Sequence, residues 1–510
     1  MTRGRNSGWI LGIILVASAI ARMAMCAGGG QYFFGDETRY DRGMQLYLGI
    51  ASGDLHGVRA TVALPDHALF PWVGALATAA QHVLAQATPF GDWARHPEYA
   101  GFTVRLGACF LSLFSALNIF LVHRLSRALG ADPEEALWAA LAMAVSNTAF
   151  YYARHLLPYD CALSAALAAM VAGAGNPGAG RAAASGLLAG CAYHLYNGYW
   201  FLAPVVLLVF AAGSRGHPRR SRLACIWGAG FFLGIGAPLL AGSLAAGGQY
   251  WRTLAAFSGT VTQGLFAEGW SLPWAYLWAS EGCAGAALAA CVALALIQSR
   301  RPLESRVRII LAALGAAYGL IVTASVLMER FVVYGRTVKP FVPLLCILAG
   351  WALRNLIGGR VWLKRAAAAA LVASGIIHFA PHLSRVFPRD VEIAVLRDLG
   401  NPKHTLSVSG SVYVPLSLPV ARTDLVLVNA QMLFPVRDYI GYPPGATLLR
   451  IEHPLTYPPY QFEGYTPRQR DLLRTEDISI RLIRLRDPGL TPDDLPPPLR
   501  FQNRERPTGR

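Results

Sequence analysis

Charged side chains are scarce in this sequence. They make up only 15% of its 510 residues, whereas hydrophobic residues make up 54% and the mean hydropathy is +0.38. Soluble domains carry about 25% charged residues, so this composition indicates a polytopic membrane protein. The net charge of +16 does not by itself indicate nucleic-acid binding, because the Lys and Arg residues lie mainly in short segments between apolar runs and in the tail. We therefore expect no nucleic-acid partner.

Motifs for zinc and nucleotide chemistry are also missing. The eight cysteines form no Cys-x-x-Cys pair, and neither a zinc-type ligand spacing nor a glycine-rich, phosphate-cradling loop is visible. We interpret the cysteines as small apolar residues within or beside the membrane. Several acidic groups could bind a divalent metal ion, but the sequence shows no dedicated ligand set and so predicts no certain cofactor.

Long apolar runs dominate the first 380 residues. About 20 apolar residues cross the hydrocarbon core of a bilayer. This rule predicts eleven spans, at residues 9–27, 102–123, 134–152, 157–174, 182–196, 199–213, 223–244, 273–297, 308–327, 339–353 and 362–380. Arg3 and Arg5 precede the first span, which predicts a cytoplasmic amino terminus. The alternatives are a cleaved signal peptide ending near Ala27, and a single kinked helix in place of the two spans within residues 182–213.

The distribution of basic loops supports this topology. Basic loops are predicted on the side of the amino terminus, near residues 123–127, 181, 215–222, 300–308 and 354–365. Less basic loops fall on the other side, at residues 28–101, 151–160, 194–200, 249–271 and 328–339. The sequence thus predicts an all-α transmembrane domain over residues 1–380, with residues 28–101 as its first outer loop. Within that loop, residues 39–50 and 68–85 are predicted to be interfacial helices.

The composition changes after Pro381. Charged residues and proline become more frequent, and alternating apolar runs at residues 405–412, 424–428 and 478–485 predict β-strands. Residues 381–510 are therefore predicted to form a small, soluble α/β domain. An odd number of spans places this domain on the extracytoplasmic side.

A cluster of charges follows the first span. The segment Phe34-Gly35-Asp36-Glu37-Thr38-Arg39-Tyr40-Asp41-Arg42 holds three carboxylates and two guanidinium groups. Charges are costly where a membrane meets water, so such a cluster indicates a functional site. A helix cap or a solvated loop start is the structural alternative for Asp36 and Glu37.

Sugar transfer on the outer face would use these charges. Nucleotide sugars are scarce outside the cytoplasm, so a transferase there needs a donor delivered through the lipid, such as a polyprenyl phosphate sugar. In an inverting single displacement, Asp36 would take the proton of the acceptor hydroxyl, and Glu37 would orient Asp36 or hold the acceptor. The leaving phosphate needs cations, for which the candidates are Arg154, Arg330, Arg336 and Lys339, with His67 as a further hydrogen-bond donor to the phosphate. Candidates for substrate binding are Tyr40, Asn197 and Tyr199.

Other interpretations of these residues remain open. Arg154 could pair with Asp160 across a tight outer turn, and the late basic residues could be anchors that reach lipid headgroups. The turn that holds Asn197 and Tyr199 could belong to an aromatic belt. A transporter or flippase of lipid-linked saccharides is the alternative function, but it should show inverted repeats and broken helices near mid-membrane, and neither is evident.

Three further motifs stand out: Asp36-Glu37-x-Arg39-Tyr40 after the first span, His67-Ala68-Leu69-Phe70-Pro71 near the interfacial helix, and Tyr152-Ala153-Arg154-His155 at the second outer loop. These motifs resemble the GT-C superfamily of membrane glycosyltransferases, above all its protein mannosyltransferase and aminoarabinose transferase group. The late loop from Arg330-Phe331 to Pro340-Phe341-Val342-Pro343 is similar too, and the resemblance covers residues 8–380. Relatives often have two prolines after the residue that corresponds to His67, whereas here only Pro71 remains, displaced along the chain.

The resemblance implies both a reaction and a location. It implies inverting transfer of a sugar from an undecaprenyl or dolichyl phosphate donor to a hydroxyl of a lipid, glycan or protein acceptor, with Asp36 as the catalytic acidic residue. The abundance of Ala, Gly and Arg suggests a bacterial protein, hence an undecaprenyl donor and a multi-pass location in the bacterial inner or plasma membrane. The active site would then face the extracytoplasmic side. The sugar, the linkage and the acceptor are not implied.

Overall fold

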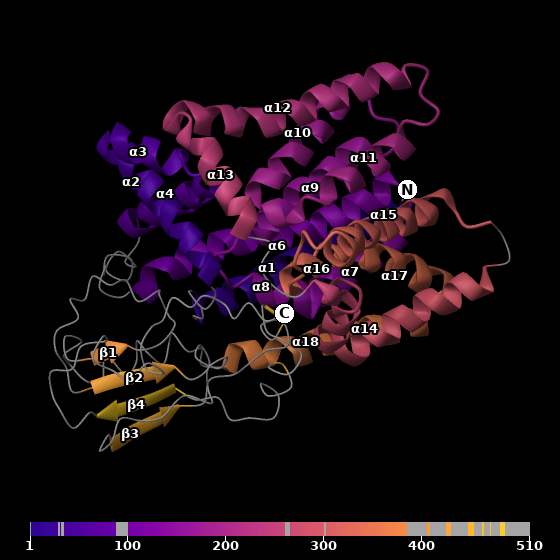
Figure 1. The fold of residues 1–510 in the computed structure, drawn as a ribbon. Coiled ribbons are helices and arrows are strands. Elements are labelled where there is room, and N and C mark those ends of the chain that lie inside the picture. Colours follow the sequence, from indigo (N-terminus) through magenta and orange to yellow (C-terminus); the bar gives the residue numbers. More distant parts are fainter. Residues whose placement is uncertain are drawn as a thin grey trace.

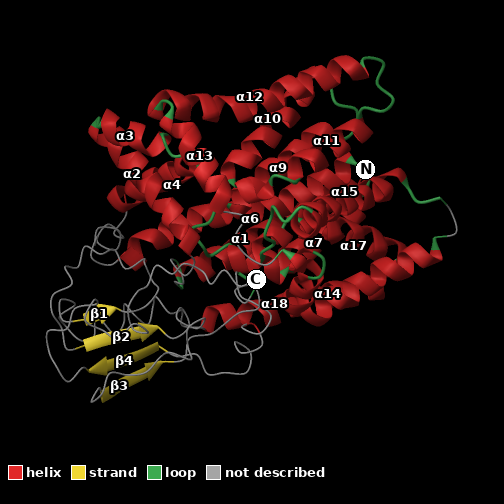
Figure 2. Ribbon diagram, viewed as in Figure 1, coloured by secondary structure: helices red, strands yellow, loops and turns green. Residues whose placement is uncertain are grey.

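Helices dominate the chain before residue 385 (Figure 1). The computed structural model describes residues 2–28, 31, 35–87, 100–260, 266–299, 302–384, 405–407, 425–429, 447–452, 462–463, 470 and 480–484. The long helices form a bundle, and the strands near the carboxyl end form one small sheet (Figure 2). The all-α class predicted for the membrane region is therefore observed.

The bundle consists of helices of very different lengths. Its longer members are α1 (Thr2–Ala27), α6 (Ala100–Ala128), α7 (Pro133–Val145), α9 (Tyr159–Gly173), α10 (Ala179–Leu195), α11 (Leu202–Gly213), α12 (Arg220–Ala246), α14 (Leu272–Gln298), α15 (Ser305–Val322), α17 (Phe341–Ile357) and α18 (Val361–Ser384). The connecting helices are α2 (Arg39–Ser52), α3 (Leu55–Val62), α4 (Phe70–Ala87), α8 (Asn147–Tyr152), α13 (Gln249–Thr260) and α16 (Gly335–Val338). Short 3-10 or π turns are η1 (Gly35–Thr38), η2 (Asn197–Tyr199), η3 (Ala267–Gly269) and η4 (Thr323–Leu327).

Six segments among the described residues are long and apolar enough to cross a membrane. They are Ser7–Ala27, Arg105–Ala128, Arg220–Ala246, Leu272–Gln298, Ser305–Leu327 and Val361–Ala380. Each of the other predicted spans also overlaps a helix, but these helices are shorter or more polar, so the number of eleven crossings stays a prediction. Residues 182–213 form two helices, α10 and α11, rather than one kinked helix, because Tyr196 between them has an extended backbone.

Large apolar side chains cover the outside of the long helices. Trp9 on α1, Phe232 on α12 and Ile377 on α18 are 75%, 74% and 68% exposed. Exposed apolar surface on this scale is unfavourable in water and favourable in lipid. Together with the six apolar segments, it identifies an integral membrane protein.

Glycines allow α10 and α12 to pack closely, side by side along the bundle (Figure 1). Gly186 and Gly190 are four residues apart on α10 and face Gly230 and Gly234 on α12. A Cβ atom added at Gly190 would lie 2.8 Å from the main-chain carbon of Gly234. Small residues at this spacing let helix backbones approach each other in a membrane.

Glu281 on α14 fixes the start of α8. Its carboxylate accepts hydrogen bonds from the main-chain N–H groups of Asn147 (2.9 Å) and Thr148 (2.8 Å), at the start of α8. The hydroxyl of Ser146 donates to the same carboxylate at 2.9 Å. A carboxylate in this position is stabilised by the helix dipole and satisfies N–H groups that have no partner within the helix. Gly282, with φ +55°, accommodates the kink in α14 at this point.

The sheet near the carboxyl end contains β1 (Thr405–Ser407), β2 (Leu425–Asn429), β3 (Thr447–Glu452) and β4 (Ile480–Arg484) in the order β1-β2-β4-β3. β1 and β2 are parallel, and β4 pairs antiparallel with both β2 and β3. The strands predicted at residues 405–412, 424–428 and 478–485 each overlap one of these strands, whereas β3 was not predicted. The α/β class of residues 381–510 and their independence as a domain stay predictions.

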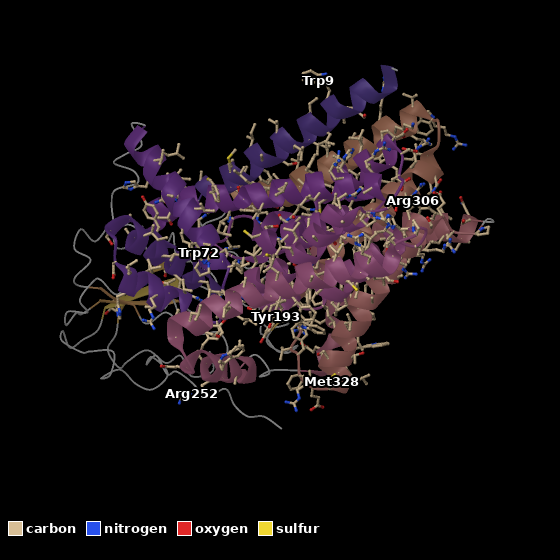
Figure 3. The ribbon with its side chains drawn as sticks, turned by 90° about the horizontal axis from the view of Figure 1, so that it is seen from above. Trp9, Trp72, Tyr193, Arg252, Arg306 and Met328 are labelled. Carbon is tan, nitrogen blue, oxygen red and sulfur yellow. The ribbon has the colours of Figure 1, made fainter. Side chains whose placement is uncertain are left out.

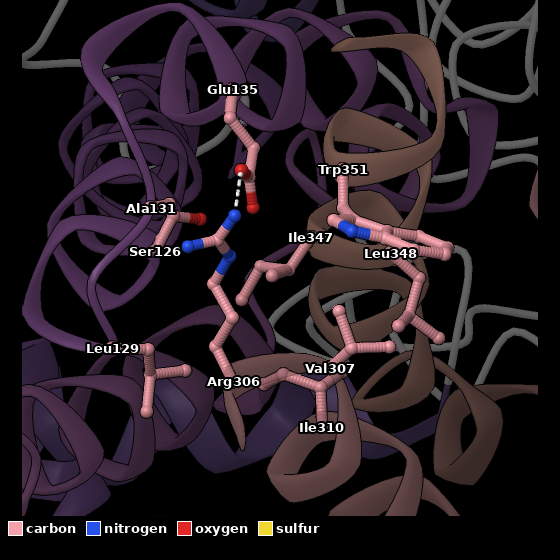
Figure 4. A pocket seen from close by; sticks show the side chains of 10 residues that line it. All are labelled: Ser126, Leu129, Ala131, Glu135, Arg306, Val307, Ile310, Ile347, Leu348 and Trp351. Atoms are coloured by element: carbon pink, nitrogen blue, oxygen red, sulfur yellow. Dashed lines mark ion pairs between the residues drawn. The ribbon is translucent and has the colours of Figure 1, made fainter. Parts of the chain in front are cut away.

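Ion pairs gather where the predicted basic loops meet the bundle. Nη2 of Arg306 lies 3.0 Å from Oε2 of Glu135, and Nε of Arg354 lies 3.0 Å from Oδ2 of Asp132. Figure 3 places Arg306 at the opposite end of the bundle from Trp72. The Glu135–Arg306 pair sits in a small pocket whose other walls are mostly apolar (Figure 4). The residues that line this pocket are not those that surround Asp36, and its two charged side chains already pair with each other.

Candidate active site

Asp36 lies in η1, between the first long helix and α2, and its side chain is 24% exposed. Its Oδ1 lies 2.8 Å from Nη1 of Arg39, and its Oδ2 lies 3.6 Å from Nη2 of Arg336. The hydroxyl of Tyr159 donates a hydrogen bond of 3.1 Å to Oδ2. Burial raises the pKa of the Asp36 carboxyl, but the guanidinium groups of Arg39 and Arg336 outweigh it and hold the pKa well below its usual range. Asp36 is therefore ionised at neutral pH.

A chain of alternating charges runs from Asp36 to His67. Nε of Arg39 donates to Oδ2 of Asp66 at 3.0 Å, and Oδ1 of Asp66 lies 3.0 Å from Nε2 of His67. The Nδ1 atom of His67 accepts a hydrogen bond from the main-chain N–H of Asn197 at 3.2 Å, which assigns the ring proton to Nε2. Burial lowers the pKa of His67, so the ring is neutral at pH 7. The structure therefore supplies His67 as a neutral donor rather than as a cation.

His67 adopts an unusual backbone conformation, with φ +50°. Left-handed backbone is strained for a residue with a side chain, and it persists where the surroundings enforce it. Here the main-chain N–H of His67 donates to Oδ1 of Asn197 at 3.1 Å, while the main-chain N–H of Asn197 donates back to the His67 ring. These reciprocal bonds join the segment between α3 and α4 to the turn after α10. Asn197 thus positions His67.

Arg336, at the start of α16, is held on every side. Its Nε donates to the hydroxyl of Tyr196 at 2.9 Å, its Nη1 forms a short ion pair with Glu463, and its Nη2 points toward Asp36. The guanidinium also lies over the ring of Tyr334, 4.2 Å from the ring centre. The structure thus brings the predicted Arg336 close to Asp36, and its role at the donor phosphate stays a prediction.

Tyrosine rings surround these charges. Tyr159 and Tyr196 pack edge to face with ring centres 4.7 Å apart, and Tyr196 and Tyr199 do so at 4.8 Å. The hydroxyl of Tyr199 donates to the main-chain oxygen of Arg336 at 3.0 Å. Tyr199, which was predicted to bind substrate, therefore lies beside the site but is almost fully buried. Its hydrogen bond holds the main chain of Arg336 in place.

Glu37 has a different environment from its neighbour Asp36. Its side chain is completely buried, and Oε1 accepts a hydrogen bond of 2.7 Å from the main-chain N–H of Leu156. The same oxygen lies 3.4 Å from Nδ1 of His155. Glu37 thus connects η1 to the segment that follows α8. This geometry favours a positioning role for Glu37 and leaves Asp36 as the accessible carboxylate.

The structure separates Lys339 and Arg154 from the ion pairs of Asp36. Nζ of Lys339 lies 2.8 Å from Oδ2 of Asp160, and neither side chain is more than 7% exposed. Arg154 donates to the main-chain oxygens of Met25 and His382, at 3.3 and 2.8 Å. The alternative that Arg154 pairs with Asp160 across the turn is wrong, because Lys339 holds that carboxylate.

Two further predicted residues lie elsewhere. The exposed Arg330 follows η4 and donates its main-chain N–H to the main-chain oxygen of Ala324, and among the described residues no hydrogen bond or ion pair joins its side chain to the Asp36 cluster. Tyr40 is completely buried, and its hydroxyl packs where a Cβ atom on Gly107 would lie only 2.1 Å away. Tyr40 therefore fills the core between α2 and α6. The phosphate role of Arg330 and the substrate role of Tyr40 stay predictions without support from these contacts.

The groups around Asp36 that were not among the predicted site residues include Arg39, Asp66, Tyr159 and Glu463. Asp66 directly precedes the predicted His67, and Tyr159 directly precedes Asp160, so short-range signals existed for both. For Glu463 the sequence offered no comparable signal. In the part of the chain that the structure describes, no group of three or more His, Cys, Asp or Glu residues could hold a metal ion.

Comparisons with known proteins address the fold. No family model and no curated protein matches this chain. Among solved structures, it is similar to ArnT from Cupriavidus metallidurans in a crystal structure bound to undecaprenyl phosphate, with 12% sequence identity and a TM-score of 0.54. The similarity covers 95% of this chain and 100% of ArnT. The chain has the fold of ArnT. The resemblance expected from the Asp36 motif is thus confirmed at the level of the fold, and it extends over the whole length of ArnT.

Proposed function

We propose that this GT-C protein is a glycosyltransferase that moves a sugar from a polyprenyl phosphate to a hydroxyl group of an acceptor, with Asp36 as the base. The observation that carries the proposal is a partly exposed, ionised carboxylate between two guanidinium groups, in a chain with the fold of ArnT. ArnT was crystallised with undecaprenyl phosphate. We propose the same class of lipid as the donor carrier here.

The reaction assigns one task to each side of the site. Asp36 takes the proton of the acceptor hydroxyl as its oxygen bonds to the anomeric carbon, while the bond from that carbon to the phosphate oxygen breaks on the opposite face. The configuration inverts, and the polyprenyl phosphate leaves as a stable anion that needs no proton. A positioned base of this kind contributes about 10²–10⁴-fold to the rate.

Arg336 and Arg39 are the cations placed to bind the phosphate. Both already bind Asp36, so an incoming phosphate would compete with that carboxylate for the same N–H groups. Loss of a guanidinium contact makes a carboxylate more basic. Binding of the donor would thus raise the proton affinity of Asp36 before the acceptor reacts. The cations then stabilise the charge that develops on the leaving phosphate.

The Asp36→Asn variant tests this proposal. In a deletion strain of the source organism, wild-type protein should restore a sugar-modified lipid, glycan or protein and consume the matching polyprenyl phosphate sugar, both measured by mass spectrometry. The variant keeps the shape of the side chain but cannot accept the proton, so we expect transfer to fall about 10²–10⁴-fold. Native mass spectrometry of the purified variant should still show bound undecaprenyl phosphate.

Asp41→Asn is the matched control. Asp41 lies one turn further along α2, and the same substitution there should leave transfer close to the wild-type rate. Wild-type transfer by a folded Asp36→Asn variant would refute the role of the base. Transferase activity itself would be refuted if the deletion changed no glycan and the wild-type protein bound no undecaprenyl phosphate.

A further inference from the structure

A segment close to the carboxyl end reaches the Asp36 site. The main-chain N–H of Gly335 donates to the main-chain oxygen of Phe462 at 3.0 Å. The ring of Phe462 is 2% exposed and packs edge to face against Tyr276, with ring centres 5.5 Å apart. A Cβ atom on Gly335 would lie 2.8 Å from the ring of Tyr276 and 3.2 Å from Phe462, so glycine is needed here for close packing.

A second contact holds this segment to an outer loop. Nη1 of Arg470 lies 3.2 Å from Oε2 of Glu268 in η3, and the guanidinium of Arg470 lies over the ring of Phe462, 5.1 Å from the ring centre. Residues from η3, α14 and α16 therefore all bind the carboxyl-terminal segment. Specific side-chain contacts therefore hold this segment and define the position of Glu463.

The carboxylate of Glu463 is aimed into the site. Its Oε1 accepts hydrogen bonds of 2.7 Å from the hydroxyl of Tyr152 and of 2.7 Å from the main-chain N–H of Arg336. Its Oε2 forms the short ion pair with Nη1 of Arg336. The side chain is only 3% exposed. One carboxylate thus binds both the main chain and the side chain of Arg336.

This double contact determines where Arg336 can point. With Nη1 on Glu463 and Nε on Tyr196, the guanidinium plane is fixed, and the remaining nitrogen, Nη2, is directed at Asp36. An arginine side chain loses much conformational freedom when it is held in this way, and orienting it in advance removes that cost from substrate binding.

We propose that Glu463 is a positioning residue of the active site, contributed by the carboxyl-terminal segment, which holds Arg336 so that Nη2 meets the donor phosphate beside Asp36. The inference rests on the proposed glycosyltransferase function and extends it. It means that a site opened by the first outer loop is completed by a residue more than 400 positions later in the sequence. Burial raises the pKa of Glu463 even beside Arg336, as expected for a carboxyl group removed from water.

Glu463→Gln tests the proposal because it removes the charge but keeps an oxygen for Tyr152. We expect the transfer rate at saturating donor to fall about 10²-fold, since small misplacements of a catalytic group have effects of this size. The affinity for undecaprenyl phosphate, measured on the purified full-length protein by native mass spectrometry, should weaken or stay the same. Glu463→Asp keeps the charge on a shorter side chain and should recover part of the rate.

A double variant distinguishes positioning from a merely structural role. If Glu463 acts through Arg336, Glu463→Gln should change the transfer rate less than about 2-fold when it is introduced into an Arg336→Gln protein. The matched control is Glu304→Gln, which removes a carboxylate from an ion pair with Arg306 at the other end of the bundle and should leave transfer unchanged.

Three results would overturn the proposal. An unchanged or faster rate in Glu463→Gln, together with tighter binding of undecaprenyl phosphate, would show that Glu463 blocks the phosphate site instead. An equal loss in the presence and absence of Arg336 would show a role that does not pass through Arg336. An unfolded Glu463→Gln protein with a folded but fully active Glu463→Asp protein would reduce Glu463 to a stability residue. Failure of the proposed function itself is distinct, because it would appear in the Asp36→Asn comparison and in the wild-type lipid binding.

Discussion

The buried pair of Lys339 and Asp160 makes a quantitative prediction about stability. Nζ of Lys339 lies 2.8 Å from Oδ2 of Asp160, with 0% and 7% of the side chains exposed. The amide of Asn118 donates to Oδ1 of Asp160 at 3.0 Å, and Ser164 donates to Asn118 at 2.8 Å. We consider three proteins: Asp160→Asn, Lys339→Met, and the variant with both substitutions.

The magnitudes follow from the burial of the pair. Removing one member of a buried ion pair leaves an uncompensated charge and costs about 3–5 kcal/mol. Asp160→Asn should reach this range, because the Lys339 ammonium then has no carboxylate. Lys339→Met should cost somewhat less, because Asn118 still donates to the remaining carboxylate. Replacing both charges together is often neutral, so the double variant should lie within about 1 kcal/mol of the wild-type protein.

Reversible unfolding of the purified protein in detergent, followed by circular dichroism or tryptophan fluorescence, measures these differences. Additive losses in the double variant would refute the pairing. The double variant also tests the predicted phosphate role of Lys339, because its folding should be intact. Because Lys339 is fully buried against Asp160, we expect the double variant to bind undecaprenyl phosphate with the affinity of the wild-type protein. A loss of binding in the double variant would assign Lys339 to the donor site.

Two further predictions concern the acidic pair in η1. Glu37→Gln should keep the transfer rate within about 10-fold of wild type, because its side-chain oxygen still accepts the N–H of Leu156. Glu37→Ala should lower the free energy of unfolding by about 1–3 kcal/mol. A Glu37→Gln variant as inactive as Asp36→Asn would indicate a catalytic role for Glu37. The folded-state pKa of Asp36 is depressed, so its stabilising contribution is present above its unfolded pKa of about 4 and is lost only as the pH falls below that value toward the folded pKa. At limiting donor, where the rate reports the free enzyme, the pH profile of transfer should consequently show no acid limb from Asp36 between about pH 5 and 8. An acid limb near pH 6 under these conditions that is absent from the residual rate of Asp36→Asn would contradict this.

Local sequence signals located the first half of the site. Asp36 follows an apolar span and lies within a dense cluster of charges, and Arg336 lies in a loop that the topology places on the same side. The structure brings these two residues within 3.6 Å of each other, and their roles in catalysis stay predictions. The helices of the membrane region were predictable for a similar reason, because apolar length is a strong and local signal.

Long-range pairing was beyond the sequence. Arg154 is closer to Asp160 in the chain than Lys339 is, and proximity alone favoured the wrong partner. Glu463 shows the same limit more strongly, because the sequence around it does not indicate that its carboxylate packs against α16. The strand β3 was missed because its apolar residues include two adjacent leucines, Leu448 and Leu449, which interrupt strict alternation.

The balance of charge around Asp36 constrains how a donor can bind. The carboxyl groups of Asp36, Asp66 and Glu463 face the two guanidinium groups of Arg39 and Arg336, so the cations are already matched by acidic groups. A phosphate that entered this half-buried site without any exchange of partners would add an unmatched negative charge, which is costly away from water. The phosphate must therefore take N–H groups from a carboxylate, and the long 3.6 Å contact between Asp36 and Arg336 is the weakest one to replace. In the proposed reaction, that exchange would free the carboxylate that acts as the base, so we expect donor binding to precede deprotonation of the acceptor.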